Sequence, residues 1–336
     1  IRKLPHQLIE SMLIAAYALQ VRHAFVYMRG EFSGPYRRLQ AAIDEAYAAG
    51  LIGENILGSG FSCDILIYRG AGSYVCGEAS ALITSIEGKR GYPRNRPPRL
   101  TVRGLYQKPT VINNVETLSN IAWIVTHGSA AFKAIGSPKA SGTRLISLSG
   151  HVVNPGVFEI EYGYPWKRLI YEDAGGMMHG AKLKCVIPGG ISTKVLTREE
   201  VERLNLDPAE VEPAGSSMGS GGMVAIAEGT CMVRLLQVML RFYHHESCGQ
   251  CTPCREGMGW LHRIIDRIVA GQGRMEDLDQ MIRISKLQDG NTICGMGDAA
   301  GYAVIGILAK YRHEFEHWIR SGRSMFEGNL ECRAST

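Results

Sequence analysis

Four cysteines in the last third of the chain constrain the fold more than any other feature. Cys248, Cys251 and Cys254 follow one another with two residues between neighbours in the run Ser-Cys-Gly-Gln-Cys-Thr-Pro-Cys, and Cys294 stands far downstream in Ile-Cys-Gly-Met-Gly-Asp. Cysteines at such spacing are typical ligands of an iron-sulfur cluster. If all four bind one cluster, two stretches that are distant in sequence must converge on a single point.

The neighbouring residues indicate how the chain would surround a cluster. Gly249 and Pro253 interrupt any helix in the first run, so that its thiols can occupy three corners of a [4Fe-4S] cluster. Cys294 would supply the fourth thiolate from the start of another helix, which we expect Asp298 to cap. A four-cysteine zinc site would more often use two Cys-x-x-Cys pairs from separate loops, and zinc or unligated core thiols are the alternatives.

The other cysteines and two nearby histidines lack this ligand spacing. We predict that the remaining thiols are packed or surface groups: Cys63, Cys76, Cys185, Cys231 and Cys332. His244 and His245 stand beside the cysteine run, and we predict that they support ligands or face solvent rather than bind the cluster. The odd total of nine cysteines, without a signal-peptide pattern, favours a reduced compartment over a disulfide framework.

A glycine-rich turn in the first third predicts a second site. Gly70, Gly72 and Gly77 separate an expected strand that ends at Tyr68 from an expected helix over Glu78–Ile86. Such a turn lets backbone amides approach a phosphate or a flavin at the helix N-terminus. The spacing differs from the dinucleotide pattern G-x-G-x-x-G, so these residues leave ligand binding and a plain tight turn equally open.

The segment that follows is strongly basic. No acidic residue lies between Glu87 and Glu116. The same window holds Lys89, Arg90, Arg94, Arg96, Arg99, Arg103 and Lys108. This local field would attract a pyrophosphate. A solvated, proline-punctuated loop is the structural alternative, and RNA is the least favoured ligand because only Tyr92 and Tyr106 interleave with the cations.

A third pattern combines a helix start with polar side chains. Asn113 stands three residues before Glu116 at the head of an apolar stretch, which predicts a capping box. Asn113, Asn114 and Thr117 could also exchange hydrogen bonds with a flavin ring or its ribityl phosphate. From these residues alone the cap is slightly favoured.

Hydrophobic periodicity predicts an α/β domain in residues 1–135. We expect a helix over Pro5–Leu19, a strand over Ala24–Met28, a helix over Pro35–Ala49 and a strand over Cys63–Tyr68. Alternating strands and helices predict a parallel sheet. Because two strands are few for such a sheet, we expect further strands of it before residue 1.

Residues 142–228 are expected to form a small α+β domain, and residues 229–336 an all-α one. The α+β pattern consists of strands at Arg144–Leu148, Gly156–Ile160 and Cys185–Ile187, a helix at Trp166–Glu172, a loop-like acidic passage at Arg198–Pro213, and the glycines Gly219, Gly221 and Gly222. After these glycines we expect only helices. Their apolar residues recur on one face, as in a helical bundle.

Composition excludes several classes of protein. With 45% hydrophobic and 21% charged residues, the chain is globular rather than fibrous or disordered. The longest apolar stretch, Met12–Leu19, is shorter than the roughly 20 residues that cross a membrane, so we expect no direct membrane insertion. A net charge of +5 is too small to indicate a nucleic-acid partner.

Four runs together resemble the NADH-binding, FMN-containing subunit of respiratory complex I, a family shared with NAD-linked and electron-bifurcating hydrogenases and formate dehydrogenases. These runs are Gly-Ala-Gly-Ser-Tyr-Val-Cys-Gly-Glu, Lys-Pro-Thr-Val-Ile-Asn-Asn-Val-Glu-Thr, Glu-Ser-Cys-Gly-Gln-Cys-Thr-Pro-Cys-Arg-Glu-Gly and Cys-Gly-Met-Gly-Asp-Ala-Ala. The resemblance covers nearly the whole chain. It implies a Rossmann-like FMN domain, a ubiquitin-like β-grasp domain and a helical bundle that holds a [4Fe-4S] cluster.

The resemblance also implies a function and partners. NADH would give a hydride to FMN, and single electrons would pass to the cluster and on to a thioredoxin-like [2Fe-2S] subunit and a larger iron-sulfur subunit. The complex would lie in the cytoplasm, or at the cytoplasmic face of the inner membrane through its partner subunits. The family's glycine-rich FMN phosphate loop would stand upstream of Pro5, outside this chain, so flavin retention by these residues alone stays open.

Residue roles follow from the same resemblance. FMN would be lined by Tyr74, Gly77, Glu78, Asn113, Asn114 and Thr117, and the cluster would be held by Cys248, Cys251, Cys254 and Cys294. Gly70 and Gly72 of the glycine-rich turn and Arg96 of the basic window complete the predicted cofactor-binding residues. Glu78 would be the catalytic residue that orients the flavin or the nicotinamide.

Two departures from the family pattern leave the nucleotide open. Ala79 stands where respiratory members have a second glutamate, and Arg99 stands where they have a phenylalanine. An arginine could pair with a 2′-phosphate, so NADP is less excluded than usual. A diaphorase subunit of an NAD(P)-linked or electron-bifurcating hydrogenase or formate dehydrogenase is one alternative, and a non-catalytic iron-sulfur relay scaffold is another.

Overall fold

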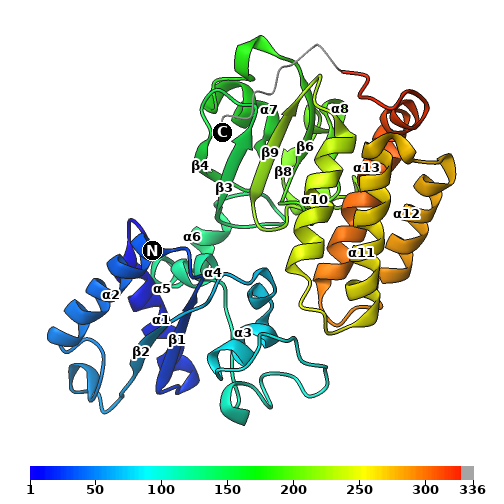
Figure 1. Ribbon diagram of the computed structural model, residues 1–336. Coiled ribbons are helices and arrows are strands. Elements are labelled where there is room, and N and C mark those ends of the chain that lie inside the picture. Colours follow the sequence, from blue (N-terminus) through cyan, green and yellow to red (C-terminus); the bar gives the residue numbers. More distant parts are fainter. Residues whose placement is uncertain (327–336) are drawn as a thin grey trace. The chain divides into compact units, whose positions relative to one another are not determined.

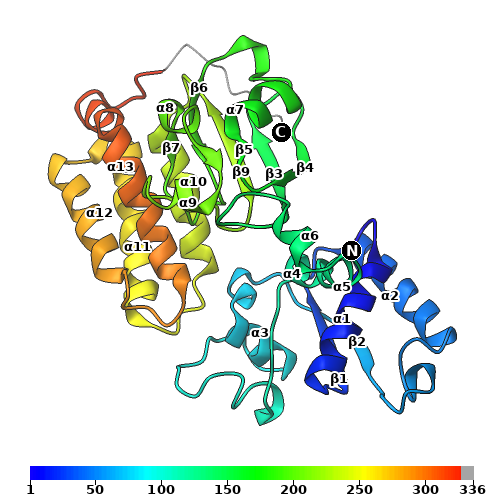
Figure 2. The same cartoon turned by 180° about the vertical axis from the view of Figure 1, so that it is seen from behind.

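The computed structural model describes residues 1–326, which form two compact units: residues 1–132, and the described residues from 133 onward. Figures 1 and 2 show the helices and strands of both units from opposite sides. The fold is mixed α/β and contains parallel strand pairs in each unit. Cys332, predicted to be a packed or surface thiol, lies outside the described residues.

The first unit contains two parallel strands with helices around them. β1 (His23–Met28) and β2 (Asp64–Arg69) pair in parallel along their whole length, which confirms the arrangement expected from the alternation of strands and helices. The helices are α1 (Pro5–Leu19), α2 (Ser33–Ala48), α3 (Ala79–Ile86), α4 (Val115–Ser119), α5 (Ile121–His127) and α6 (Ser129–Lys133). Leu8, Leu39 and Ile65 share a buried core, so α1 and α2 pack on the strand pair.

The second unit contains a five-stranded sheet in the order β4-β3-β9-β6-β7. Its strands are β3 (Thr143–Gly150), β4 (Gly156–Glu161), β6 (Leu183–Ile187), β7 (Leu196–Thr197) and β9 (Gly222–Ala227). β9 pairs in parallel with β3 and antiparallel with β6. A separate short pair joins β5 (Tyr164–Pro165) to β8 (Asn205–Leu206).

Strand β9 corrects the expectation that only helices follow Gly222. Met223 and Ala225 lie in the core on one face of the sheet, while Val224 and Ile226 pack into the core on the other face. Because both faces are buried, the strand shows a continuous apolar run instead of the alternation that marks a half-buried strand. Periodicity alone could not separate this run from the helix that comes after it.

The acidic passage Arg198–Pro213 is more ordered than the expected loop. It contains the short helices α8 (Arg198–Val201) and α9 (Pro208–Val211). Thr197 and Glu200 form a capping box at α8, and Asp207 caps α9. The expected helix at Trp166–Glu172 is present as α7 (Trp166–Arg168), followed by a wider helical turn through Asp173.

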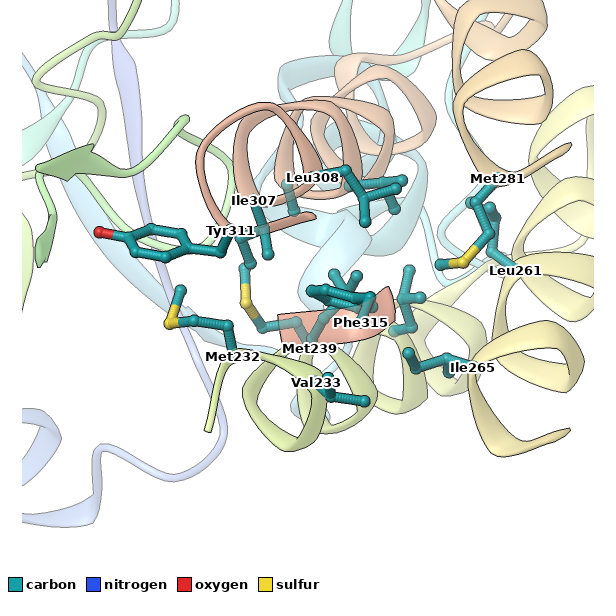
Figure 3. Close-up of a cluster of buried hydrophobic side chains, with 14 of the residues drawn as sticks. Met232, Val233, Met239, Leu261, Ile265, Met281, Ile307, Leu308, Tyr311 and Phe315 are labelled. Atoms are coloured by element: carbon teal, nitrogen blue, oxygen red, sulfur yellow. The ribbon is translucent and has the colours of Figure 1, made fainter. Parts of the chain in front are cut away.

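Four helices of the second unit pack against one another and against the sheet. They are α10 (Met232–Glu246), α11 (Thr252–Arg267), α12 (Met275–Gln288) and α13 (Gly295–Ser321). Their apolar side chains point toward one another in Figure 3, among them Met239, Leu261, Met281 and Phe315. The same core includes Ile187 of β6, so these helices cover one face of the sheet.

A buried ion pair connects α13 to the sheet. Lys184 of β6 pairs with Glu314 of α13, and their side chains are only 8% and 2% exposed. Glu314 also accepts a hydrogen bond from the backbone N–H of Met232 at the start of α10 (2.9 Å). Because a charge buried this deeply is costly without its partner, the pair holds α10, α13 and β6 in one arrangement.

Candidate functional site

The structure brings the four predicted cluster cysteines to the ends of three helices. Cys248 and Cys251 lie in the loop between α10 and α11, Cys254 lies in the first turn of α11, and Cys294 directly precedes α13. Cys254 is buried, and Cys251 and Cys294 pack against the same small apolar core that contains Met258. Two stretches that are distant in sequence therefore meet, as the spacing predicted.

The environment of Cys254 reports how close the thiols are. The pKa of Cys254 is raised to about 11, chiefly by burial; the hydroxyl of Ser247 lowers it, and the nearby Cys251, Cys294 and Cys248 contribute to the rise. The Ser247 Oγ lies 3.3 Å from the Cys254 Sγ. Among residues 1–326, no group of three or more His, Cys, Asp or Glu side chains is arranged to hold a single metal ion.

Arg255 organises the loop that carries the first two cysteines. Its guanidinium donates to the carbonyl oxygen of Gly249 (2.8 Å) and lies 3.4 Å from the Thr252 hydroxyl. Gly249 has a φ of +82°, which is favourable only for glycine. The Arg255 Nε also pairs with Glu256 (3.0 Å), so part of its charge is neutralised by that carboxylate.

Asp298 does not cap α13, contrary to the sequence prediction. Its carboxylate accepts a hydrogen bond from the Gly290 N–H (3.2 Å) and lies 2.9 Å from the Thr292 hydroxyl. The N-cap residue of α13 is Cys294, which makes no side-chain capping bond. The carboxylate of Asp298 therefore reaches back to Gly290 and Thr292 and stabilises the loop before Cys294.

Gln288 supports the first turn of α11 from the end of α12. Its side-chain amide donates to the carbonyl oxygen of Pro253 (3.1 Å), next to Cys254 in the chain. The residue is 1% exposed, and a Cβ at Gly257 would collide with its amide. The glycine is therefore required so that Gln288 can reach the cysteine run.

The two histidines beside the loop contact other groups. The His244 ring stacks on His262 at 5.2 Å between centroids, and its pKa is lowered by burial and by the charges of His262, Arg263 and His245. His245 lies 3.3 Å from Glu246. Cys254 and the three predicted ligands near it are all sulfur donors, the ligand type of iron-sulfur clusters.

In the first unit, the glycine-rich turn follows β2 and ends at Glu78, the N-cap residue of α3. One carboxylate oxygen of Glu78 accepts from the backbone N–H groups of Ser80 and Ala81, both at 2.9 Å, and from the Ser80 hydroxyl. The other oxygen accepts from the Arg96 guanidinium at 3.1 Å. The structure therefore brings together two predicted site residues that are distant in sequence.

The glycines of this turn have different structural demands. A Cβ at Gly70 would overlap the Tyr27 hydroxyl, and Gly72 has a φ of +90°. The position of Gly77 has open space for a side chain. Tyr74, whose pKa is raised by burial, begins the short helical turn before Glu78. Packing and backbone conformation alone thus account for two of the three glycines.

The basic window separates into structural and exposed cations. Arg94 pairs with Glu87 at 2.7 Å and donates to the Gly104 carbonyl oxygen. Arg96 pairs with Glu78, as described above. Arg99 and Lys108 have exposed side chains. Part of the predicted phosphate field is therefore already used to hold the segment against α3.

The predicted capping box at Asn113 is wrong by one residue. Asn114 is the N-cap of α4, and its side-chain oxygen accepts from the Glu116 N–H at 2.8 Å. Asn113 and Thr117 are exposed on either side of this helix start. The error arose because adjacent asparagines offer two equivalent caps, and the approach of the chain to α4 decides between them.

Two side chains at the sites were missed from the sequence. Glu31 follows β1 and lies against Gly72, and its pKa falls to about 2 because Arg29 and a backbone N–H donate to it. The sequence did carry a signal for Glu31. Glu31 follows β1 and Gly70 follows β2, and the carboxyl ends of parallel strands lie at the same edge of a sheet. Ser247 had no comparable signal beyond its place beside Cys248.

A cavity of about 930 Å³ lies elsewhere in the first unit. It is lined mainly by apolar side chains of α1, α5 and the loop between α2 and β2, including Leu13, Phe61 and Trp123. None of the predicted FMN residues lines it. Within residues 1–326, no helix combines the length and the apolar character needed to cross a membrane.

Comparison with known families places both sites in one class of protein. Residues 1–123 match the Nuo51 FMN-binding domain, and residues 234–318 match the NADH-ubiquinone oxidoreductase-F iron-sulfur binding region. The Glu78 turn lies inside the first match, and all four cysteines lie inside the second. The fold and the site therefore define an iron-sulfur flavoprotein.

Individual relatives specify the family. The chain is 46% identical to an NADH-quinone oxidoreductase subunit of the F type in Rhizobium meliloti, over 96% of this chain and 76% of the relative. It is 44% identical to the mitochondrial NADH dehydrogenase [ubiquinone] flavoprotein 1 of Dictyostelium discoideum, over 94% of this chain and 66% of the relative. The chain belongs to the family of F-type NADH-quinone oxidoreductase subunits.

A solved structure shows the same fold. An NAD+-reducing [NiFe]-hydrogenase in the H2-reduced state superposes with a TM-score of 0.84 at 32% identity, over 94% of this chain. The chain spans 52% of the length of that hydrogenase chain.

Proposed function

We propose that the chain is the electron-input part of an NADH dehydrogenase of the NADH:quinone oxidoreductase type. One observation carries the proposal: Cys248, Cys251, Cys254 and Cys294 come together inside the segment that matches an iron-sulfur binding region. When bound, FMN accepts a hydride from a reduced nicotinamide and releases electrons singly, and a [4Fe-4S] cluster carries single electrons. All other steps depend on how this chain positions those groups.

The four cysteines are the proposed cluster ligands, and the surrounding residues prepare them. Burial raises the pKa of Cys254, so its thiol would lose the proton on binding metal rather than before it. Arg255 fixes the loop at Gly249, and Gln288 fixes Pro253. The ligands are therefore held by contacts that do not depend on the metal.

FMN and the nicotinamide would be held in the first unit. The proposed FMN residues are Gly70, Gly72, Tyr74, Gly77, Glu78, Arg96, Asn113, Asn114 and Thr117. Because both oxygens of Glu78 already accept hydrogen bonds, its role is to orient α3 and Arg96 toward the bound ligand rather than to accept a proton. Asn114 caps α4, which leaves the amides of the exposed Asn113 for a ligand.

The choice between NADH and NADPH depends on Ala79 and Arg99. Ala79 is the first residue of α3, directly after Glu78, and carries no charge that would repel a 2′-phosphate. Arg99 is exposed in the basic window. We propose NADH as the donor, in line with the relatives' names. The second candidate function is a diaphorase subunit of an NAD(P)-linked hydrogenase or formate dehydrogenase, which the superposition on the hydrogenase favours.

We further propose that the chain has three domains. Residues 1–135 would form a Rossmann-like FMN domain, residues 142–228 a ubiquitin-like β-grasp domain, and residues 229–336 a helical bundle. The mixed sheet β4-β3-β9-β6-β7 and the four packed helices support the last two assignments. A thioredoxin-like [2Fe-2S] subunit and a larger iron-sulfur subunit would receive the electrons, at the cytoplasmic face of the inner membrane.

An anaerobic visible spectrum of the longest natural chain that contains these residues tests the function. We expect a flavin band over a broad iron-sulfur shoulder, bleached by NADH and less by NADPH. A Cys254→Ala variant serves as the control, because it should lose the shoulder and keep the flavin band. A shoulder that neither nucleotide bleaches would favour the relay scaffold, and a colourless protein containing zinc would contradict the proposal.

A further inference from the structure

We propose that Ser247 sets the reduction potential of the iron-sulfur cluster through a hydrogen bond from its hydroxyl to the sulfur of Cys254. This inference rests on the proposed ligand set. It concerns a residue that is not itself a ligand and that the sequence pattern did not single out. Its basis is the 3.3 Å distance between the Ser247 Oγ and the Cys254 Sγ.

The backbone that carries the Ser247 hydroxyl is fixed at a helix end. Ser247 is the C-cap residue of α10, and its N–H donates to the Tyr243 carbonyl oxygen at 3.1 Å. Cys254 lies in the first turn of α11, whose start is fixed by the bond from Gln288 to Pro253. Both partners of the contact are therefore fixed by helix ends and not by flexible loops.

The direction of the hydrogen bond follows from chemistry. In the free thiol form either group could donate, but a cysteine that binds iron has lost its proton. Only the Ser247 hydroxyl can then donate, and a hydrogen bond to a charged acceptor is shorter and stronger than a neutral one. The Cys254 side chain is buried among Tyr243, Met258 and Met296, where solvent weakens the bond little.

The hydrogen bond should favour the reduced cluster. Reduction adds one negative charge to the cluster and its sulfur ligands, so a donor to a ligand sulfur stabilises the reduced form more than the oxidised form. Removal of the donor should therefore make the midpoint potential more negative. Electron acceptance from the flavin would become less favourable by the same amount.

The test compares three variants of the complete natural chain with its cofactors. Ser247→Ala removes the donor, and Ser247→Thr keeps a hydroxyl at the same place. Thr252→Ala is the matched control, because Thr252 is the first residue of α11, next to Cys251, and its hydroxyl contacts Arg255 instead of a thiol. Iron and acid-labile sulfide are measured first, and the midpoint potential is then determined by a redox titration followed by electron paramagnetic resonance.

We expect Ser247→Ala to bind iron fully and to shift the one-electron equilibrium constant about tenfold, which is about 59 mV toward negative potential. Ser247→Thr and Thr252→Ala should stay close to the wild-type potential. In deuterated water, pulsed resonance spectra should show one strongly coupled exchangeable deuteron in the wild type and in Ser247→Thr that Ser247→Ala lacks.

Other outcomes overturn the inference. An unchanged potential in an iron-replete Ser247→Ala protein, or an equal shift in Thr252→Ala, would do so. If Ser247→Ala binds no cluster, a Ser247→Thr protein with wild-type iron, potential and deuteron coupling supports the hydroxyl, whereas loss of iron in both variants shows a packing role and contradicts it. A wild-type chain without iron would instead refute the proposed ligand set, and the iron analysis separates that failure from the others.

Discussion

The cysteine site and the Glu78 turn are both built at helix starts, but different forces hold them. The N-cap residues of α11 and α13 are Cys251 and Cys294, which make no side-chain capping bonds. The N-cap residue of α3 is Glu78, whose carboxylate satisfies the first amides of the helix. The cysteine site is supported by buried contacts beneath it, whereas the Glu78 turn is supported by hydrogen bonds and ion pairs near the surface.

This difference shows which helix starts have backbone N–H groups that a ligand can still use. Helix starts without capping side chains leave amide groups for an incoming anionic group, provided that the core holds the helices. A capped start is already satisfied, so a ligand at Glu78 must use other groups, such as Arg96. We therefore expect changes near the cysteines to affect metal content, and changes near Glu78 to affect nucleotide oxidation.

The largest effect should come from Cys254. Cys254→Ala removes the most buried of the proposed ligands and should abolish the cluster, with loss of its iron and its resonance signal. Cys231→Ala is the control, because that cysteine precedes α10 and shows no ligand spacing. Full iron content in Cys254→Ala, or loss of iron in Cys231→Ala, would contradict the ligand assignment.

The next largest effect should come from the buried ion pair between Lys184 and Glu314. Glu314→Gln leaves the Lys184 charge in the core without its partner, which should lower the free energy of unfolding by about 3–5 kcal/mol. Glu172→Gln breaks an exposed pair with Arg168 and should cost less than about 1 kcal/mol. Chemical denaturation of the full chain compares the two, and equal costs would show that burial is not the decisive factor.

Lowering the pH should weaken the contacts of the Glu87 carboxylate in the first unit. Burial raises the pKa of Glu87, but hydrogen bonds from Arg94 and the Tyr106 N–H and the charges of Arg94 and Lys89 lower it more, so the net pKa lies below its usual value. Because the folded pKa is the lower one, the stabilisation is complete above the unfolded value of about 4.3 and is lost as pH falls through the folded value.

The Glu87→Gln variant measures how much the charged carboxylate of Glu87 stabilises the folded protein. At neutral pH the wild type should be more stable by about 1.5–3 kcal/mol, the usual contribution of a hydrogen bond to a charged group. In urea denaturation of the full chain, this advantage should shrink as the pH is lowered from about 5 through the usual carboxyl pKa and then through the lowered pKa of Glu87. An advantage that is independent of pH would mean that the carboxylate of Glu87 contributes by packing and not by charge.

The smallest effect concerns Glu78 itself. Glu78→Gln keeps an oxygen that can cap α3 but loses the charge that pairs with Arg96. Loss of a charged hydrogen bond predicts a fall in kcat/KM for NADH of about tenfold, with iron content unchanged. An unchanged NADH rate would refute the role of Glu78, and loss of iron would show that the two units are not functionally separate.

Local sequence was sufficient where one segment determines its own structure. The helix over Pro5–Leu19 begins and ends as predicted, because its apolar residues recur at helical spacing after an N-terminal proline. The strands near Ala24 and Cys63 were also found within about two residues, the usual uncertainty of element ends. The cysteine spacing predicted that Cys254 and Cys294 converge, because cluster chemistry requires it.

Tertiary structure alone decided the features that depend on distant partners. β9 became a strand because β3 and β6 flank it, and its apolar run carried no alternation to reveal this. Asn114 rather than Asn113 caps α4, and Arg96 pairs with Glu78, because the path of the chain brings those groups within hydrogen-bond distance. The sequence by itself determined which chemical groups and local periodicities are present, since these depend on near neighbours. The fold decided which groups meet, as Ser247 and Cys254 do, because a contact between helix ends depends on the packing of the whole core.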